Sequence, residues 1–207
     1  MLDGLGFNDV ANIIIVITCL LVSMTIHEFM HAYVGFRLGD TTAMEKGRVS
    51  FNPLHHIDPF MTVLLPAVTL IFLHAPILAA KPVPFNPNRL KYGDYGAALL
   101  ALAGPLSNLV LAILGALLLQ VVTLSQNVGE VVVFFVELNV ALAVFNLVPI
   151  PPLDGSRVLY ALAPEGVQDF MQLIEPYGFM IIIFLILWGG ASNVLGSLDN
   201  FVLRLLP

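Results

Sequence analysis

The chain has 207 residues, of which 58% are hydrophobic and only 11% are charged, and its mean hydropathy is +0.94. Soluble domains carry roughly 25% charged residues, so this composition excludes an ordinary soluble protein and indicates an integral membrane protein. The net charge of −6 and the lack of a basic run argue against nucleic acid as a partner. The length predicts a single membrane-embedded domain over residues 1–207.

Four apolar stretches are long enough to cross the roughly 30 Å hydrocarbon core of a membrane as helices. They lie at about 10–36, 97–124, 131–148 and 177–194. We therefore expect an all-α polytopic membrane protein.

The first stretch carries two histidines one helical turn apart, His27 and His31, with Glu28 beside them. Ionisable groups at membrane depth cost several kcal/mol unless they are paired or bind a metal. On a helix both imidazoles point the same way and can bind one zinc ion, while Glu28 is placed to act on a water at the metal. The H-E-x-x-H pattern thus indicates metal-assisted hydrolysis, although two histidines bonded to neighbouring helices would show the same spacing.

Residues 47–53 alternate small or polar residues with apolar ones. Alternation is typical of a strand, so we expect either a short β-hairpin near 44–53 or a plain loop. The open edge of a strand would hold an extended peptide by strand addition.

A fifth apolar stretch at 60–80 contains Pro66 and Pro76, so it forms either a kinked fifth span or a re-entrant segment. Short loops rich in Lys and Arg stay cytoplasmic. With a re-entrant segment, all but the last of the eight basic residues share one side, whereas a full span separates those at 37–48 from those at 81–91. We therefore favour the re-entrant arrangement, with both loops at the cytoplasmic face.

A catalytic zinc site takes three protein ligands and keeps a fourth position for water, so a third ligand is required. Asp154 is the strongest candidate, because it follows the third apolar stretch and three prolines within residues 149–152. These prolines prevent a helix, so the chain runs extended until Gly155 permits a turn that can direct the carboxylate back into the bundle. An aspartate that caps a helix from Ser156 would give the same sequence.

Two asparagines in apolar helices, Asn108 and Asn146, are candidate donors to the oxyanion that forms when a peptide bond is attacked. Asn108 shares a face of small residues with Gly104, so an interhelical hydrogen bond at a close helix contact explains it equally well.

These residues resemble the site-2 proteases, a family of intramembrane zinc metalloproteases that cut substrates within or near the membrane. The resemblance rests on the HEFMH sequence at 27–31 and on NLVPIPPLDG at 146–155, which is similar to the family's N-x-x-P-x-P-x-x-D-G signature. It extends to NPL at 52–54, KPVP at 81–84 and AGPLSN at 103–108, and it looks like the short bacterial branch without PDZ domains.

The resemblance implies that His27, His31 and Asp154 bind one zinc ion per chain and that Glu28 is the catalytic acid and base. It implies a multi-pass endopeptidase of the cell (inner) membrane that acts on membrane-protein or peptide substrates in the lipid bilayer. The distribution of basic residues separately places the three ligands near the cytoplasmic side. Whether the chain forms a homo-oligomer is left open.

Two other functions fit the same residues: a carrier that passes metal ions between the histidines and the aspartate, and a non-proteolytic relative that binds client proteins. Glu28 distinguishes a protease from a carrier, because Glu28→Gln would stop hydrolysis and leave metal transport intact.

Overall fold

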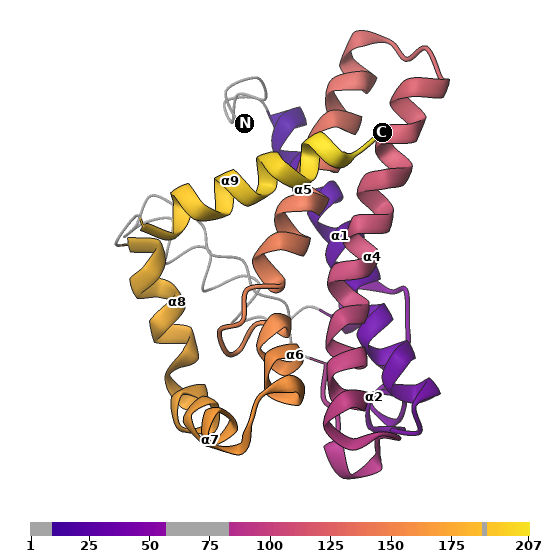
Figure 1. Cartoon of the computed structure of the whole chain (residues 1–207). Coiled ribbons are helices and arrows are strands. Elements are labelled where there is room, and N and C mark those ends of the chain that lie inside the picture. The colour runs from indigo at the N-terminus through magenta and orange to yellow at the C-terminus, as the bar shows by residue number, and fades with distance from the viewer. Residues whose placement is uncertain (1–9, 57–82, 188–189) are drawn as a thin grey trace.

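The computed structural model describes residues 10–56, 83–187 and 190–207, and this described part of the chain is helical and contains no strand (Figure 1). The prediction of an all-α architecture is confirmed for these residues. In chain order the elements are α1 (Val10–Arg37), α2 (Thr42–Glu45), η1 (Pro53–His55), η3 (Pro87–Arg89), α4 (Gly93–Val121), α5 (Gln126–Asn146), α6 (Asp154–Leu162), α7 (Glu165–Ile174), η4 (Glu175–Tyr177), α8 (Gly178–Leu187) and α9 (Gly190–Leu205).

Three of the described helices, α1, α4 and α5, are long and apolar enough to cross a membrane. They contain 28, 29 and 21 residues, so at about 1.5 Å per residue each exceeds the roughly 30 Å hydrocarbon core. α4 packs against α1, α5 and α6 and so forms the centre of the bundle (Figure 1).

The fourth expected span, 177–194, is not confirmed as one long helix. α8 has ten residues, which at about 1.5 Å per residue is about half of the membrane core. α9 runs in a different direction and crosses α5 (Figure 1). The apolar character of a stretch does not reveal where a helix ends, which is why the sequence suggested a continuous span here.

The β-hairpin expected near 44–53 is wrong for the described chain, which forms α2, a turn and η1 in this region. Local polar groups bond the backbone here: the Asn52 side chain accepts a hydrogen bond from Leu54 N at 3.1 Å, and Arg48 donates to the carbonyl of His55. Such bonds offer the backbone an alternative to pairing between strands. The segment at 60–80, expected to re-enter or to span, lies outside the described residues.

Small residues bring α1 and α4 close together. Ala32 and Ala101 are 0% and 2% exposed, and a Cβ added to Gly35 would lie 2.9 Å from Leu100 Cδ1. Small side chains at a membrane helix interface let the backbones approach closely. This close approach places the histidine face of α1 directly against α4.

Asp40, which is 1% exposed, joins the loop after α1 to the loop before α4. Its Oδ1 accepts from Thr42 N at 3.0 Å and from Thr42 Oγ1 at 2.5 Å, and its Oδ2 accepts from Asn86 N at 2.6 Å. Lys91 N also donates to the carbonyl of Leu38 at 2.8 Å. The residues around 38–42 and 86–91 therefore lie side by side at one end of the bundle.

Candidate metal centre

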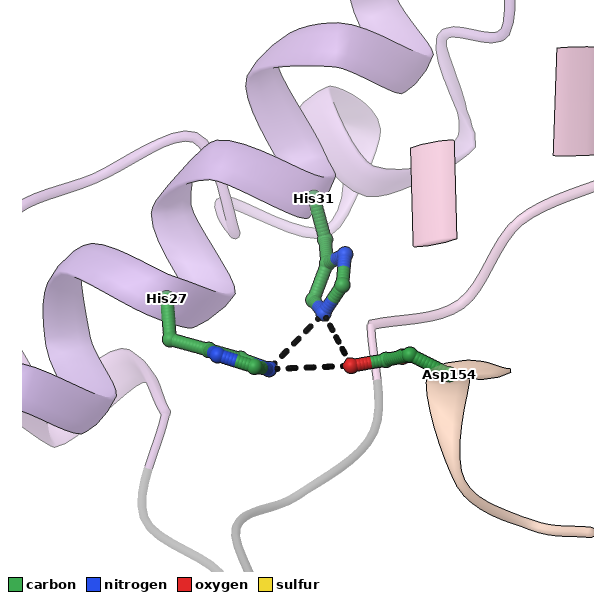
Figure 2. A group of neighbouring side chains, drawn as sticks. All are labelled: His27, His31 and Asp154. Atoms are coloured by element: carbon green, nitrogen blue, oxygen red, sulfur yellow. Dashed lines mark hydrogen bonds and ion pairs between the residues drawn. The ribbon is translucent and has the colours of Figure 1, made fainter. Parts of the chain in front are cut away.

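Three ligand atoms from distant parts of the chain meet between α1 and the start of α6. His27 Nε2 lies 2.9 Å from His31 Nε2, and Asp154 Oδ2 lies 3.2 Å from the first and 3.3 Å from the second (Figure 2). The rings project from adjacent turns of α1, and the carboxylate points at them from the opposite side (Figure 2). The structure thus brings together the three residues that the sequence predicted as ligands.

Each histidine ring is oriented through its other nitrogen. His31 Nδ1 donates to the carbonyl of Leu100 at 2.8 Å, and His27 Nδ1 contacts Asn108 Oδ1 at 2.6 Å. A carbonyl oxygen only accepts hydrogen bonds, so Nδ1 carries the proton in both rings and Nε2 is left with a lone pair in the neutral form. This is the usual arrangement of metal-binding histidines, whose second nitrogen donates to a carbonyl or carboxylate.

Asp154 is the first residue of α6 and is placed by the packing of the proline-rich loop before it. A Cβ on Gly155 would overlap the carbonyl oxygen of Leu147, and a Cβ on Gly178 would overlap that of Pro151. Both glycines therefore permit backbone contacts that fold the loop against the end of α5 and the start of α8. The Asp154 side chain is 21% exposed, whereas those of His27 and His31 are 4% and 6% exposed.

Burial alone would raise the pKa of Asp154, but the charge of His31 and the contacts with both histidines lower it to about 2. The group is therefore an ionised carboxylate at neutral pH. Two imidazole nitrogens and a carboxylate oxygen cannot direct lone pairs at one another without a proton or a metal cation between them.

Gly104 supplies the space that a metal ion would need. A Cβ at this position would overlap His31 Nε2 and would lie 2.6 Å from His27 Nε2. Because residue 104 has no side chain, the space beside both nitrogens is open. The position of the absent Cβ lies only slightly farther from each nitrogen than a bound zinc ion would, since zinc–nitrogen bonds are about 2.0–2.1 Å. The two nitrogens, the carboxylate oxygen and this space fit a zinc ion.

Glu28 follows His27 in α1 and is 7% exposed. Its carboxylate is within electrostatic range of both histidines, of Asp154 and of His56. His56 is 4% exposed, and its Nε2 donates to the carbonyl of Ser50 at 2.8 Å. Glu28 is thus the acidic side chain beside the three ligands, as the H-E-x-x-H spacing predicted.

Asn108 makes the interhelical hydrogen bonds that the sequence offered as the alternative to an oxyanion role. It is 0% exposed, and besides accepting from His27 it donates through Nδ2 to Asn139 Oδ1 at 2.8 Å and to the carbonyl of Ser23 at 3.5 Å. Asn146, at the end of α5, is partly buried and donates to the carbonyl of Leu142 at 2.8 Å.

Three contributors to the site were missed by the sequence reasoning: Ser23, Asn139 and the carbonyl of Leu100. Asn139 could have been noticed as a third asparagine in an apolar helix, and Ser23 as a hydroxyl one turn before His27. The carbonyl of Leu100 has no signal in the sequence, because every residue carries a carbonyl.

Comparison with known proteins identifies the family. A family profile described as Peptidase family M50 matches residues 120–188. "Putative zinc metalloprotease YwhC" of Bacillus subtilis is 38% identical over 190 residues, which cover 87% of this chain and 84% of that protein. Rip2 of Mycolicibacterium smegmatis, which carries the same description, is 29% identical over 184 residues, covering 84% of this chain and 67% of Rip2. No solved structure matches the chain significantly.

A centre of two buried histidines and one carboxylate, in a bundle of helices long and apolar enough to cross a membrane, defines the class as a membrane metalloprotein. The chain belongs to peptidase family M50, the site-2 protease family of zinc metalloproteases, and is therefore an enzyme.

Proposed function

We propose that this enzyme is an intramembrane endopeptidase that hydrolyses peptide bonds in or near transmembrane segments. His27, His31 and Asp154 are the zinc ligands, and Glu28 is the general base and acid. The observation that carries the proposal is the meeting of the three ligand atoms within 4.8 Å of one another, with Gly104 leaving space beside the two histidine nitrogens and with Glu28 buried.

When bound, zinc supplies Lewis-acid chemistry, which makes a water acidic enough to deprotonate near neutral pH and polarises the scissile carbonyl. Glu28 takes the proton from the attacking water and then gives it to the leaving amine. Asn146 remains the candidate donor to the oxyanion. We assign Asn108 no role at the oxyanion, because its amide group already makes hydrogen bonds with His27, Asn139 and Ser23.

We further propose a multi-pass protein of the cell membrane whose site faces the cytoplasm. The contacts of Asp40 with Asn86 and of Leu38 with Lys91 support this orientation, because they join the two basic loops at one end of the bundle. Loops rich in Lys and Arg stay cytoplasmic. Reporters fused near residues 45 and 88 should therefore report the same side.

The test of the proposed chemistry is Glu28→Gln, which keeps the size of the side chain and removes its basicity. Cells that express the wild type should contain shortened membrane-protein fragments, detected by quantitative mass spectrometry, and cells that express Glu28→Gln should lack them. The purified variant should still bind one zinc ion, because the three ligands are unchanged. Glu45→Gln, at an exposed position, is the matched control and should cleave normally.

Undiminished fragments in Glu28→Gln would contradict the assignment of Glu28. A different outcome would indicate a metal carrier instead: the wild type produces no fragments, and both the wild type and Glu28→Gln carry zinc into sealed vesicles. His27→Ala and Asp154→Ala should each lose zinc, and retained stoichiometric zinc in either variant would contradict the ligand set.

A further inference from the structure

A chain of buried hydrogen bonds links α5 to His27 through α4. Asn139 Nδ2 donates to the carbonyl of Phe135 at 2.8 Å and to Ser23 Oγ at 2.9 Å. Asn108 Nδ2 donates to Asn139 Oδ1 at 2.8 Å, and Asn108 Oδ1 faces His27 Nδ1 at 2.6 Å. The side chains of Asn139 and Asn108 are both 0% exposed, so water does not compete for these bonds.

The Phe135 carbonyl sets the direction of the bonds in this chain, and the longer contact from Asn108 Nδ2 to the Ser23 carbonyl, at 3.5 Å, has the same direction. Because a carbonyl only accepts, Asn139 must turn its NH₂ group toward Phe135 and its oxygen toward Asn108. Asn108 must then present its own NH₂ group to Asn139 and its oxygen to His27. His27 is left with one choice, which is to carry its proton on Nδ1 and leave a lone pair on Nε2.

Reversing the chain would place two acceptors or two donors against each other. A buried polar group left without a partner destabilises the folded state, so the observed direction is strongly preferred. His31 needs no such relay, because its Nδ1 bonds directly to the carbonyl of Leu100. The two histidines thus reach the same tautomer by different routes, and only that of His27 depends on side chains.

We propose that Asn139 is a positioning residue that sets the tautomer of His27 through Asn108 and so holds its Nε2 ready to bind zinc. The inference rests on the proposed function, in which His27 is a ligand, and it assigns Asn139 no contact with the metal or the substrate.

The experiment measures the zinc affinity of the purified full-length chain in detergent by competition with a chromophoric chelator. Asn139→Leu, which is similar in size and cannot hydrogen-bond, should lower the affinity about 10- to 100-fold, the usual effect of losing an outer-shell partner. Val140→Ala, a neighbouring buried position on α5, is the control for lost packing and should leave zinc affinity unchanged.

A relay through Asn108 predicts three results that a purely structural role does not. Asn139→Leu should cost almost nothing further in an Asn108→Leu background, because the intermediary is already absent. Asn108→Asp should restore zinc affinity to Asn139→Leu, since a carboxylate presents an acceptor to His27 in either orientation. ¹⁵N NMR of the protein labelled with ¹⁵N-histidine should show His27 protonated at Nδ1 in the wild type. In Asn139→Leu it should show a mixture of the two tautomers of His27.

Unchanged zinc affinity in Asn139→Leu, or additive losses with Asn108→Leu, would overturn the relay. If Asn139→Leu does not fold, Asn139→Ala removes the same amide and should lower zinc affinity in the same way. His27→Ala separates this inference from the proposed function. Full zinc affinity in His27→Ala refutes His27 as a ligand, whereas a loss there without a loss in Asn139→Leu refutes only the relay.

Discussion

The two histidines and the aspartate of the candidate metal centre are held by different means. His27 and His31 are 3% and 5% exposed and lie in a membrane-spanning helix, where each Nδ1 bonds an oxygen of α4. Asp154 starts a short helix after a proline-rich loop, and backbone contacts at Gly155 and Gly178 set its position. The histidine side is thus fixed by buried hydrogen bonds, and the aspartate side by the fit of a loop.

Substitutions on the two sides should therefore impair metal binding in different ways. On the histidine side, a change alters the direction of a lone pair or fills the space next to it. On the aspartate side, a change shifts the whole loop and moves an otherwise normal carboxylate. Three substitutions test this comparison.

The largest effect is expected from Gly104→Ala on the histidine side. The new Cβ would overlap His31 Nε2 and lie 2.6 Å from His27 Nε2, so the variant should lose stoichiometric zinc. Alanine favours a helix over glycine by about 1 kcal/mol, so circular dichroism should show that the helices persist. Metal analysis of purified protein measures the loss.

Gly129→Ala, in α5, is the matched control because a Cβ there meets nothing within 4 Å. It should keep its zinc while gaining the same helix propensity. Full zinc in Gly104→Ala would show that the space beside the histidines is not needed for the metal.

A smaller effect is expected from Gly178→Ala on the aspartate side. A Cβ there would overlap the Pro151 carbonyl, so α8 or the loop must shift and carry Asp154 with it. Zinc affinity should fall, but less than in Gly104→Ala, since a loop can readjust more easily than packed helices. Gly166→Ala, where a Cβ meets nothing within 4 Å, should bind zinc normally. A loss equal to that of Gly104→Ala would remove the distinction between the two sides.

The smallest effect on zinc binding is expected from Asp40→Ala, which removes contacts of the loop that follows the C-terminal end of α1. The change leaves Thr42 N and Asn86 N without their acceptor, at a cost of about 1–3 kcal/mol in the free energy of unfolding. Denaturant unfolding in detergent measures it. Glu45→Ala removes an exposed ion pair with Arg89 and should cost less than about 1 kcal/mol.

The cost of Asp40→Ala should depend on pH. Burial opposes ionisation of Asp40, but hydrogen bonds from Thr42 and Asn86 outweigh it and lower the pKa. A carboxyl whose pKa is lowered by folding stabilises the protein above its unfolded pKa, about 3.9, and loses that contribution as the pH falls through the folded pKa. The difference between wild type and Asp40→Ala should therefore shrink on acidification below about pH 4. A constant difference would mean that the charge of Asp40 contributes nothing.

Sequence reasoning succeeded where the controlling interactions are local. The length of an apolar run predicted α1, α4 and α5, and the H-E-x-x-H spacing placed two imidazoles on one helix face. The β-hairpin near 44–53 does not form, because side chains there bond the nearby backbone, and residues 46–52 fit the alternative of a plain loop. The span at 177–194 is not confirmed.

Composition, helical periodicity and two motifs were enough to predict the membrane setting, the family resemblance and the three candidate ligands. The folded chain adds the features that hold these candidate ligands: the space at Gly104, the carbonyl of Leu100 and the bonds from Asn139 through Asn108 to His27. Sequence patterns miss these features because they arise between helices far apart in the chain. A missing side chain, a backbone oxygen or the direction of an amide acquires its role only from what packs against it.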